Sequence, residues 1–313
     1  MRVLVTGATG FIGRALCTEL KRIGAFVRAA VRQPAEAVAD ETQLIRDFED
    51  APDWTKAVAG IDIVFHVAAL AHAPLKEASR RLQTINVDAT DSLARAASAA
   101  QVERLVFLSS VSVYEASRTS FRESDPPAPR DAYGASKAAA EDRVRKSGVR
   151  YTIVRAPLVY GPGVRANFLK LLRAVDCRIP LPLGGVSNSR SLVHVANLCD
   201  AMIFLSRHPQ AMNRIFLVAD GEDVSTPELI RRIGAALGKV PRIFPFPVPA
   251  LRIVALMTGR SKTLEKLIGD ASVDMSALRD LGWKPPFSMQ QGLQSTAAWY
   301  RDRASHGPPF SSW

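Results

Sequence analysis

The sequence has few cysteines, and their scarcity excludes several classes of protein. Only three of the 313 residues are cysteine, namely Cys17, Cys177 and Cys199. An odd and widely spaced set of this kind provides neither a disulfide framework nor a zinc knuckle, and it is typical of a reducing cytosol. We therefore expect a cytoplasmic protein whose chemistry does not depend on thiols.

Long apolar runs are also missing. No segment reaches the roughly 18 uninterrupted apolar residues that a membrane-spanning helix needs. The nearest candidate, residues 248–257, is interrupted by Pro249 and Arg252. The apolar stretch in residues 1–7 is too short to act as a secretory signal. These absences predict a soluble protein that does not insert into a membrane.

Acidic residues are in the minority, since 41 lysines and arginines stand against 30 aspartates and glutamates and give a net charge of +11. Such an excess favours polyanionic partners. The basic residues are spread along the whole chain without interleaved aromatic residues, so we expect phosphorylated small molecules and no nucleic acid. Four histidines have no zinc-like pairing with cysteine or with one another, so no metal site is expected; these are His66, His72, His194 and His208.

The remaining composition, with 47% apolar and 23% charged residues, is that of a globular protein. Apolar and β-branched runs predict strands that alternate with stretches of helical period. The expected strands are 2–5, 26–31, 43–46, 61–66, 104–109 and 151–155, and the expected helices are 11–23, 75–100 and 132–146. Repeated alternation of this kind predicts an α/β fold with a doubly wound parallel sheet.

The alternation loosens after residue 155. Prolines and a glycine pair punctuate residues 157–190, and two further expected strands, 191–195 and 214–218, flank a helix at 196–206. Two or three helices follow from about residue 222. We predict a larger domain of residues 1–160 and 190–221, and a smaller C-terminal lobe of residues 161–189 and 222–313.

Three glycines separate the first expected strand from the first helix, with the spacing G-x-x-G-x-x-G. Gly7 permits a tight turn, Gly10 lets the backbone approach a pyrophosphate, and Gly13 allows close packing of helix and sheet. The spacing differs from the G-x-G-x-x-G of ordinary dinucleotide dehydrogenases, and a loop with packing glycines would look the same. The position directly after the first strand favours a dinucleotide, so the larger domain is predicted to bind NAD or NADP in a Rossmann fold.

The end of the second strand carries arginines and no acid. Many NAD sites place a carboxylate there against the adenosine ribose, whereas an arginine can accept a 2′-phosphate. We hypothesise that Arg32, with Arg28 as the second choice, favours NADP or removes discrimination against it. The alternative is a solvated arginine at the edge of the sheet.

Three polar residues form a candidate group for proton transfer. Tyr133 and Lys137 are four residues apart at the start of an expected helix, so their side chains share one face. An ammonium near a phenol lowers the phenol pKa from about 10 toward neutrality, which makes tyrosine usable as a general acid or base. Ser110 ends the fifth expected strand, at the sheet edge where ligands bind, and its hydroxyl can bond the substrate oxygen.

These motifs, in this order, resemble the extended short-chain dehydrogenase/reductases, and specifically the NAD-dependent epimerase/dehydratase family of nucleotide-sugar enzymes. The resemblance covers nearly the whole chain and rests on TGATGFIG at 6–13, RDF at 46–48, HVAA at 66–69, INV at 85–87, SSVSVY at 109–114, YGASK at 133–137, RAPLVYGPG at 155–163, NSRSLVHV at 188–195 and LGWKP at 281–285. It implies that the larger domain binds the dinucleotide and that the lobe binds the substrate.

The resemblance also implies roles for individual residues. The catalytic residues would be Ser110, Tyr133 and Lys137. The cofactor would contact Gly7, Thr9, Gly10, Phe11, Ile12, Gly13, Arg32, Asp47 at the adenine, Ala68, Tyr133 and Lys137. The substrate would contact Ser110, Asn167 and, through its diphosphate, Arg190, whereas Asn86 would be structural.

One departure from the family pattern reduces the number of reactions to be expected. Family dehydratases carry an Asp-Glu pair directly after the catalytic serine or threonine, and here these positions are Val111 and Ser112. A 4,6-dehydratase is therefore excluded as the expected activity. Two enzymes stay open: a 4-epimerase of a UDP-hexose or UDP-N-acetylhexosamine, and an NAD(P)H-dependent 4-ketoreductase that makes a deoxy nucleotide sugar.

A redox-sensing binding protein without catalysis is the third alternative. It is disfavoured because the serine, tyrosine and lysine are all present. The resemblance also implies a homodimer, for which the helices near residues 75–100 and 132–148 are reasonable pairing surfaces.

Overall fold

A computed structural model describes residues 1–33, 37–45, 48, 52–71, 78–114, 120–259 and 261–306, with the side chains of residues 262, 263, 266 and 304–306 left aside. Within these ranges, no helix combines the length and the apolar character needed to cross a membrane.

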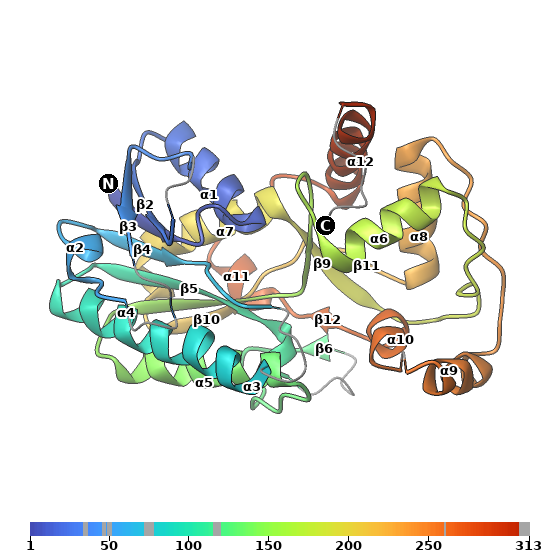
Figure 1. Cartoon of the computed structure of the whole chain (residues 1–313), viewed down its shortest axis with the longest axis horizontal. Helices are drawn as coiled ribbons and strands as arrows, with labels where there is room; N and C mark the ends of the chain where they lie inside the picture. Colours follow the sequence, from blue (N-terminus) through green and yellow to red (C-terminus); the bar gives the residue numbers. More distant parts are fainter. Residues whose placement is uncertain are drawn as a thin grey trace.

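The centre of the molecule is a seven-stranded sheet (Figure 1) in the order β10-β7-β5-β4-β1-β2-β3. Every neighbouring pair in it is parallel. The strands are β1 (Arg2–Thr6), β2 (Phe26–Val31), β3 (Glu41–Leu44), β4 (Ile63–His66), β5 (Arg104–Ser110), β7 (Tyr151–Ala156) and β10 (Arg214–Leu217). The reversal of strand order between β1 and β4 is that of a Rossmann fold, so the predicted doubly wound sheet is confirmed.

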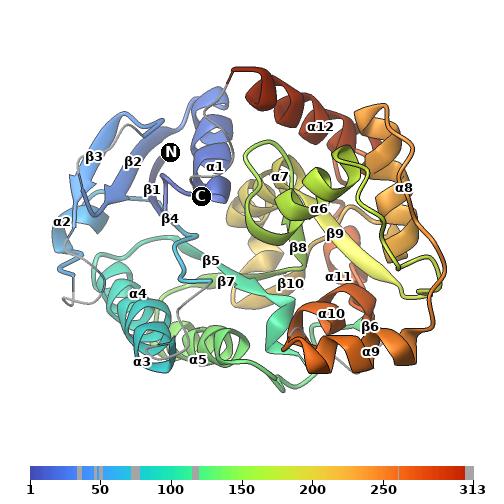
Figure 2. The same ribbon diagram turned by 45° about the vertical axis from the view of Figure 1, so that its right-hand side comes forward.

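The strands other than β3, at the edge of the sheet, are largely apolar because helices cover both faces of the sheet. Val3 and Val5 of β1 pack on one side, whereas Leu4 between them packs on the other. The first side is covered by α1 (Phe11–Arg22), α7 (Val195–Arg207) and α11 (Ser276–Asp280). The second side is covered by α2 (Thr55–Val58), α4 (Ala89–Ala99) and α5 (Ala132–Lys146), and Figure 2 shows α4 and α5 together there.

The helix expected over residues 75–100 is interrupted. The chain forms α3 (Ala78–Leu82), then a π-helical segment (Gln83–Asp88), and only then α4. Asn86 lies in the π-helical segment, and its amide nitrogen donates to Ser136 Oγ of α5 at 3.0 Å. Both the N–H and the carbonyl of Leu70, which follows β4, bond to the same side chain. Asn86 therefore ties three segments together, as expected for a structural asparagine.

A second group of elements gathers beside the sheet (Figures 1 and 2). Its helices are α6 (Ala166–Asp176), α8 (Thr226–Leu237), α9 (Val248–Met257), α10 (Ser261–Ile268) and α12 (Met289–His306). Its short strands are β6 (Ser120–Phe121), β8 (Leu158–Tyr160), β9 (Arg190–His194), β11 (Asp223–Val224) and β12 (Ser272–Val273). These elements have an apolar core of their own, and Phe11, at the glycine turn, packs against both this core and that of the sheet.

Candidate active site

The glycine turn has no space for side chains. Gly7 has a φ of +73°, and a Cβ there would lie 2.8 Å from the backbone nitrogen of Ala68. A Cβ at Gly13 would lie 2.0 Å from the carbonyl oxygen of Gly7. Strand β1, helix α1 and the loop after β4 therefore meet through bare backbone, which brings Gly7, Gly13 and Ala68 together as the sequence suggests.

The first turn of α1 is open to an anion. Gly10 is the N-cap, no side chain caps the helix, and no acidic residue lies in its first turn. The unpaired N–H groups and the helix dipole favour negative charge at this end. Thr9 supports the loop, since its carbonyl accepts a hydrogen bond from Arg14 Nε at 3.0 Å. The turn thus fits a dinucleotide pyrophosphate; Asp47, expected at the adenine, lies outside the described residues.

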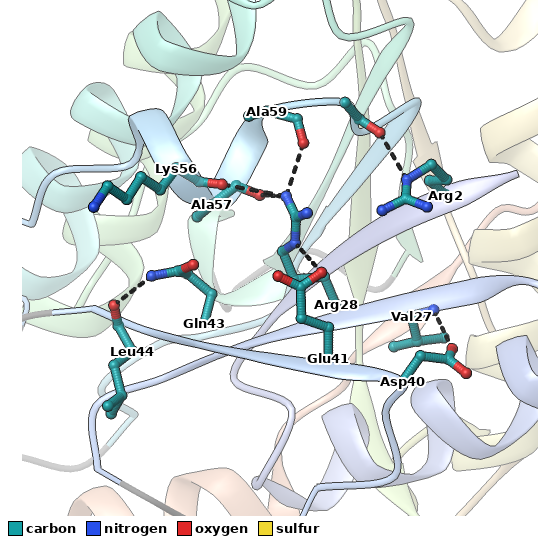
Figure 3. Close-up of polar contacts among 11 residues, drawn as sticks. Arg2, Val27, Arg28, Asp40, Glu41, Gln43, Leu44, Lys56, Ala57 and Ala59 are labelled. Atoms are coloured by element: carbon teal, nitrogen blue, oxygen red, sulfur yellow. Dashed lines mark hydrogen bonds and ion pairs between the residues drawn. The ribbon is translucent and has the colours of Figure 1, made fainter.

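Arg28 and Arg32 lie in different surroundings. Arg28 is buried, and its Nη1 donates to three backbone carbonyls around the end of α2 (Figure 3), at 2.8 Å for Ala59, 2.9 Å for Ala57 and 3.2 Å for Lys56. Its Nε donates to Glu41 at 3.0 Å. Arg28 as a second choice for a 2′-phosphate is therefore wrong, because its donors hold β2, β3 and α2 together. Arg32 follows the end of β2 and is exposed.

Ser110 and Tyr133 are brought together by two capped turns. Ser110 ends β5 and caps the 3₁₀ turn that follows, with its hydroxyl accepting from Ser112 N at 3.1 Å. Helix α5 begins one residue before Tyr133, and the N-cap Asp131 accepts from Gly134 N at 2.7 Å. The Ser110 hydroxyl donates to Ser112 Oγ at 3.1 Å, and it lies near enough to Tyr133 to lower the pKa of the phenol. The serine and the tyrosine expected to move a proton are thus neighbours.

Gly134 explains how closely α5 approaches this turn. A Cβ at Gly134 would lie 2.1 Å from the carbonyl oxygen of Ser112. The helix therefore rests directly on the backbone that carries Ser110. A larger residue at this position would push the two segments apart.

Burial dominates the proton affinities of the site. It raises the pKa of Tyr133 to about 12, with a smaller rise from the charge of Asp131 and an opposing effect of the Ser110 hydrogen bond. Burial also lowers the pKa of Lys137 to about 7, against the opposing charge of Glu141, and the Lys137 ammonium lies 4.0 Å from the ring centroid of Phe107. The sequence suggests that Lys137 lowers the Tyr133 pKa; in the structure the pKa is raised, because the loss of water around the phenol is the largest effect.

A buried ion pair lies beside the catalytic candidates, and sequence reasoning missed it. Glu141 of α5 and Arg155 of β7 have side chains that are 0% and 1% exposed, and Arg155 Nη2 donates to Glu141 Oε2 at 2.6 Å. Ser109, which precedes Ser110, donates to Glu141 Oε1 at 2.6 Å. Tyr133, Lys137 and Glu141 follow one another at four-residue intervals, so this spacing on one helix face was the available signal.

The two substrate candidates lie on the second group of elements. Asn167 is exposed in the first turn of α6. Arg190 begins β9, its Nη1 donates to the carbonyl of Gly269 at 3.1 Å, and burial lowers its pKa. Arg190 is thus hydrogen-bonded to the backbone just before β12, whereas Asn167 lies on α6.

The sequence matches the model of the NAD dependent epimerase/dehydratase family over residues 3–219. The chain belongs to this family. It is 35% identical over 308 residues to a UDP-glucose 4-epimerase of Vibrio cholerae, covering 94% of each chain. It is 26% identical over 313 residues to an N-acetyl-alpha-D-glucosaminyl-diphospho-ditrans,octacis-undecaprenol 4-epimerase of Escherichia coli O157:H7, covering 94% of this chain and 93% of that one.

Solved structures agree with this assignment. The fold resembles that of MoeE5 in complex with UDP-glucuronic acid and NAD, with a TM-score of 0.78, 28% identity and coverage of 96% of this chain and 99% of that chain. This member of the epimerase/dehydratase family is therefore an NAD-dependent enzyme of the short-chain dehydrogenase/reductase type. The family description names NAD, and the MoeE5 complex contains NAD.

The proposed contact of Arg32 with the 2′-phosphate of NADP can be tested by measuring how strongly the enzyme binds NADP and NAD. We expect Arg32→Ala to raise the dissociation constant for NADP roughly tenfold, because a lost hydrogen bond to a charged group costs about 1.5 kcal/mol, and to leave NAD binding unchanged. Fluorescence titration with each cofactor measures both constants. Gln33→Ala, at the exposed neighbouring position, is the matched control. Unchanged selectivity in Arg32→Ala would show that Arg32 is only a solvated surface residue.

Proposed function

We propose that the enzyme is a 4-epimerase of a UDP-hexose or a UDP-N-acetylhexosamine. The observation that carries the proposal is the placement of Ser110, at the end of β5, beside Tyr133, in the first turn of α5, at the same edge of the sheet as the glycine turn. In open α/β sheets this edge binds the ligand. The 35% identity to a UDP-glucose 4-epimerase over 94% of the chain supports the choice of reaction.

Each proposed catalytic residue has a separate role in the transfer of one proton. Tyr133, as phenolate, accepts the proton of the sugar C4 hydroxyl and later returns it, while the Ser110 hydroxyl donates a hydrogen bond to the same oxygen. Lys137 would hold the nicotinamide ribose. NAD, when bound, would supply the acceptor for the hydride of C4 and the donor that returns it to the other face of the keto sugar. The glycine turn and Ala68 would hold the cofactor beside these residues.

We further propose that residues 161–189 and 222–313 form the substrate lobe, whereas residues 1–160 and 190–221 bind the dinucleotide. Arg190 would bind the substrate diphosphate, for which a buried guanidinium is suited because it offers paired donors to phosphate oxygens. Asn167, exposed at the start of α6, would face the nucleotide sugar. The homodimer and the cytoplasmic location stay predictions.

The reaction is tested with purified enzyme and UDP-galactose carrying deuterium at C4, and separately with the corresponding UDP-N-acetylgalactosamine. We expect conversion to the gluco isomer with deuterium retained at C4 and without net formation of reduced cofactor, since the hydride returns to the carbon it left. Chromatography with mass spectrometry measures the product and its label. Mass spectrometry of ligands retained through purification reports the bound cofactor.

The same experiment distinguishes the 4-epimerase from the alternative, a 4-ketoreductase. That enzyme would consume one NAD(P)H for each 4-keto sugar reduced, and it would leave UDP-galactose and UDP-N-acetylgalactosamine unchanged. Stoichiometric oxidation of NAD(P)H with a UDP-4-keto sugar, together with no interconversion of either pair of isomers, would contradict the epimerase proposal.

A further inference from the structure

Helix α9 has apolar side chains on two opposite sides. One side packs into the molecule, since Ala255 is buried and Val248 and Leu251 contact the apolar core of the second group of elements. The other side is open. Its exposed side chains, named here the α9 patch, are Ile253, Val254, Leu256 and Met257, with exposed fractions of 61%, 52%, 73% and 82%.

The α9 patch is unusual for a surface helix. Such a helix normally carries one apolar stripe toward the core and polar residues on the opposite face. At about 100° per residue, the four side chains of the α9 patch fall within one arc of roughly 160°, so they form a continuous surface. Within the described part of the chain, seven of the 15 exposed large apolar residues lie between positions 240 and 257. An exposed apolar patch of this kind marks an interaction site.

The chain around the α9 patch is strongly basic. Residues 239–266 contain one acidic residue, Glu265, against six basic residues, which are Lys239, Arg242, Arg252, Arg260, Lys262 and Lys266. Lys239, Arg242 and Arg252 are exposed. Arg252 Nε lies 3.1 Å from the carboxylate of Glu265, so the single acid of the segment is already paired. Lys239 Nζ lies 3.7 Å from Asp176, outside the segment. An apolar patch in a segment with a net positive charge is complementary to a surface that is apolar inside and anionic outside.

We propose that the α9 patch docks the enzyme on the surface of an anionic lipid bilayer, with α9 lying in the plane of the interface. Its ten residues extend about 15 Å, at 1.5 Å each, which is too short to cross the hydrocarbon core. Helices α9 and α10 lie at the end of the molecule away from β2 and β3 (Figure 1), so the second group of elements meets the membrane. The inference goes beyond the proposed reaction and does not depend on it.

Charge also decides between a bilayer and a second copy of the chain. A symmetric pairing through α9 places the same basic segment of both copies at one interface, because a two-fold interface uses one surface twice. Like charges would then repel, whereas an anionic headgroup layer attracts each lysine and arginine. The sign of the charge therefore favours lipid.

Co-sedimentation with vesicles tests the proposal. The full-length protein is mixed with vesicles of phosphatidylcholine alone or of equal parts phosphatidylcholine and phosphatidylglycerol. We expect binding to the anionic vesicles at least roughly tenfold above binding to the neutral ones, with a decrease at high salt. Leu256→Ser combined with Met257→Ser should lower anionic binding by roughly tenfold or more, because it removes the apolar contact and keeps the charge.

The control removes two exposed apolar side chains elsewhere. Ile179→Ser combined with Met212→Ser changes residues that are 51% and 40% exposed, and it should bind vesicles like the wild type. NAD titration and thermal unfolding show that each variant is folded, and neither readout requires turnover. Absence of wild-type binding to anionic vesicles, or equal binding by the α9 variant, overturns the proposal. So does a wild-type dimer in sedimentation velocity that Leu256→Ser with Met257→Ser converts to monomer without any lipid binding.

Discussion

Replacing Tyr133 by phenylalanine should lower kcat by roughly 10³-fold, the middle of the range that general acid-base catalysis contributes. The phenyl ring keeps the shape of the site, whereas the phenolic oxygen near Ser110 is lost. Binding of NAD should be nearly unchanged, because the glycine turn and the N-terminus of α1 are untouched. Steady-state turnover of the UDP-sugar and titration with NAD measure the two effects.

The pH dependence of the same experiment follows from the pKa of about 12 that burial gives Tyr133. A raised pKa means that the phenol keeps its proton at neutral pH, and below that pKa the phenolate fraction grows tenfold for each pH unit. The wild-type rate of sugar oxidation should therefore rise with pH, and Tyr133→Phe should lose this rise. Tyr151→Phe is the matched control, because Tyr151 is the first residue of β7 and lies at the edge of the sheet opposite to the candidate site. A Tyr133→Phe enzyme with kcat close to wild type would show that Tyr133 does not transfer the proton.

Replacing Glu141 by glutamine should destabilise the protein by about 4 kcal/mol, because Arg155 is left buried with an uncompensated charge. The two side chains are 0% and 1% exposed, and Ser109 shares the carboxylate. Urea denaturation monitored by circular dichroism measures the change in the free energy of unfolding. Substitution of an isolated surface acid would not give an effect of this size.

The neighbouring residue provides the matched control. Asp142 forms an ion pair with Arg145 at 2.7 Å, and in this pair the arginine and aspartate side chains are 31% and 59% exposed. An exposed pair contributes at most about 1 kcal/mol, so Asp142→Asn should change the free energy of unfolding much less than Glu141→Gln. Similar effects of the two substitutions would show that the Glu141–Arg155 pair is not the strong structural link that its geometry indicates.

The sheet was predictable because its strands other than β3 are buried on both faces and follow one another with helices between them. Strand β5 is a run of apolar residues, and α5 begins directly after a capping aspartate, so 104–109 and 132–146 were placed to within a residue. The glycine spacing predicted the contact of Gly7 with Gly13, because only residues without a Cβ allow backbone segments to approach so closely.

The features that the sequence did not reveal depend on tertiary contacts. The π-helical segment around Asn86 keeps the helical period of its neighbours, so only its bonds to Leu70 and Ser136 distinguish it. Arg28 and Arg32 look alike in sequence, but carbonyls from residues 56–59 bury the first of them. The pKa of Tyr133 is likewise set by burial, which no local pattern reports. The assigned roles of Asn167 and Arg190 stay predictions.

The contact between Gly134 and the carbonyl of Ser112 has a consequence for how such an enzyme diversifies. Since a Cβ at Gly134 would lie 2.1 Å from that oxygen, the spacing of the serine and the tyrosine is fixed by main chain against main chain. Substitutions of side chains around Ser110 and Tyr133 can then leave the distance between these two residues unchanged. Substitutions in the second group of elements leave this main-chain contact in place.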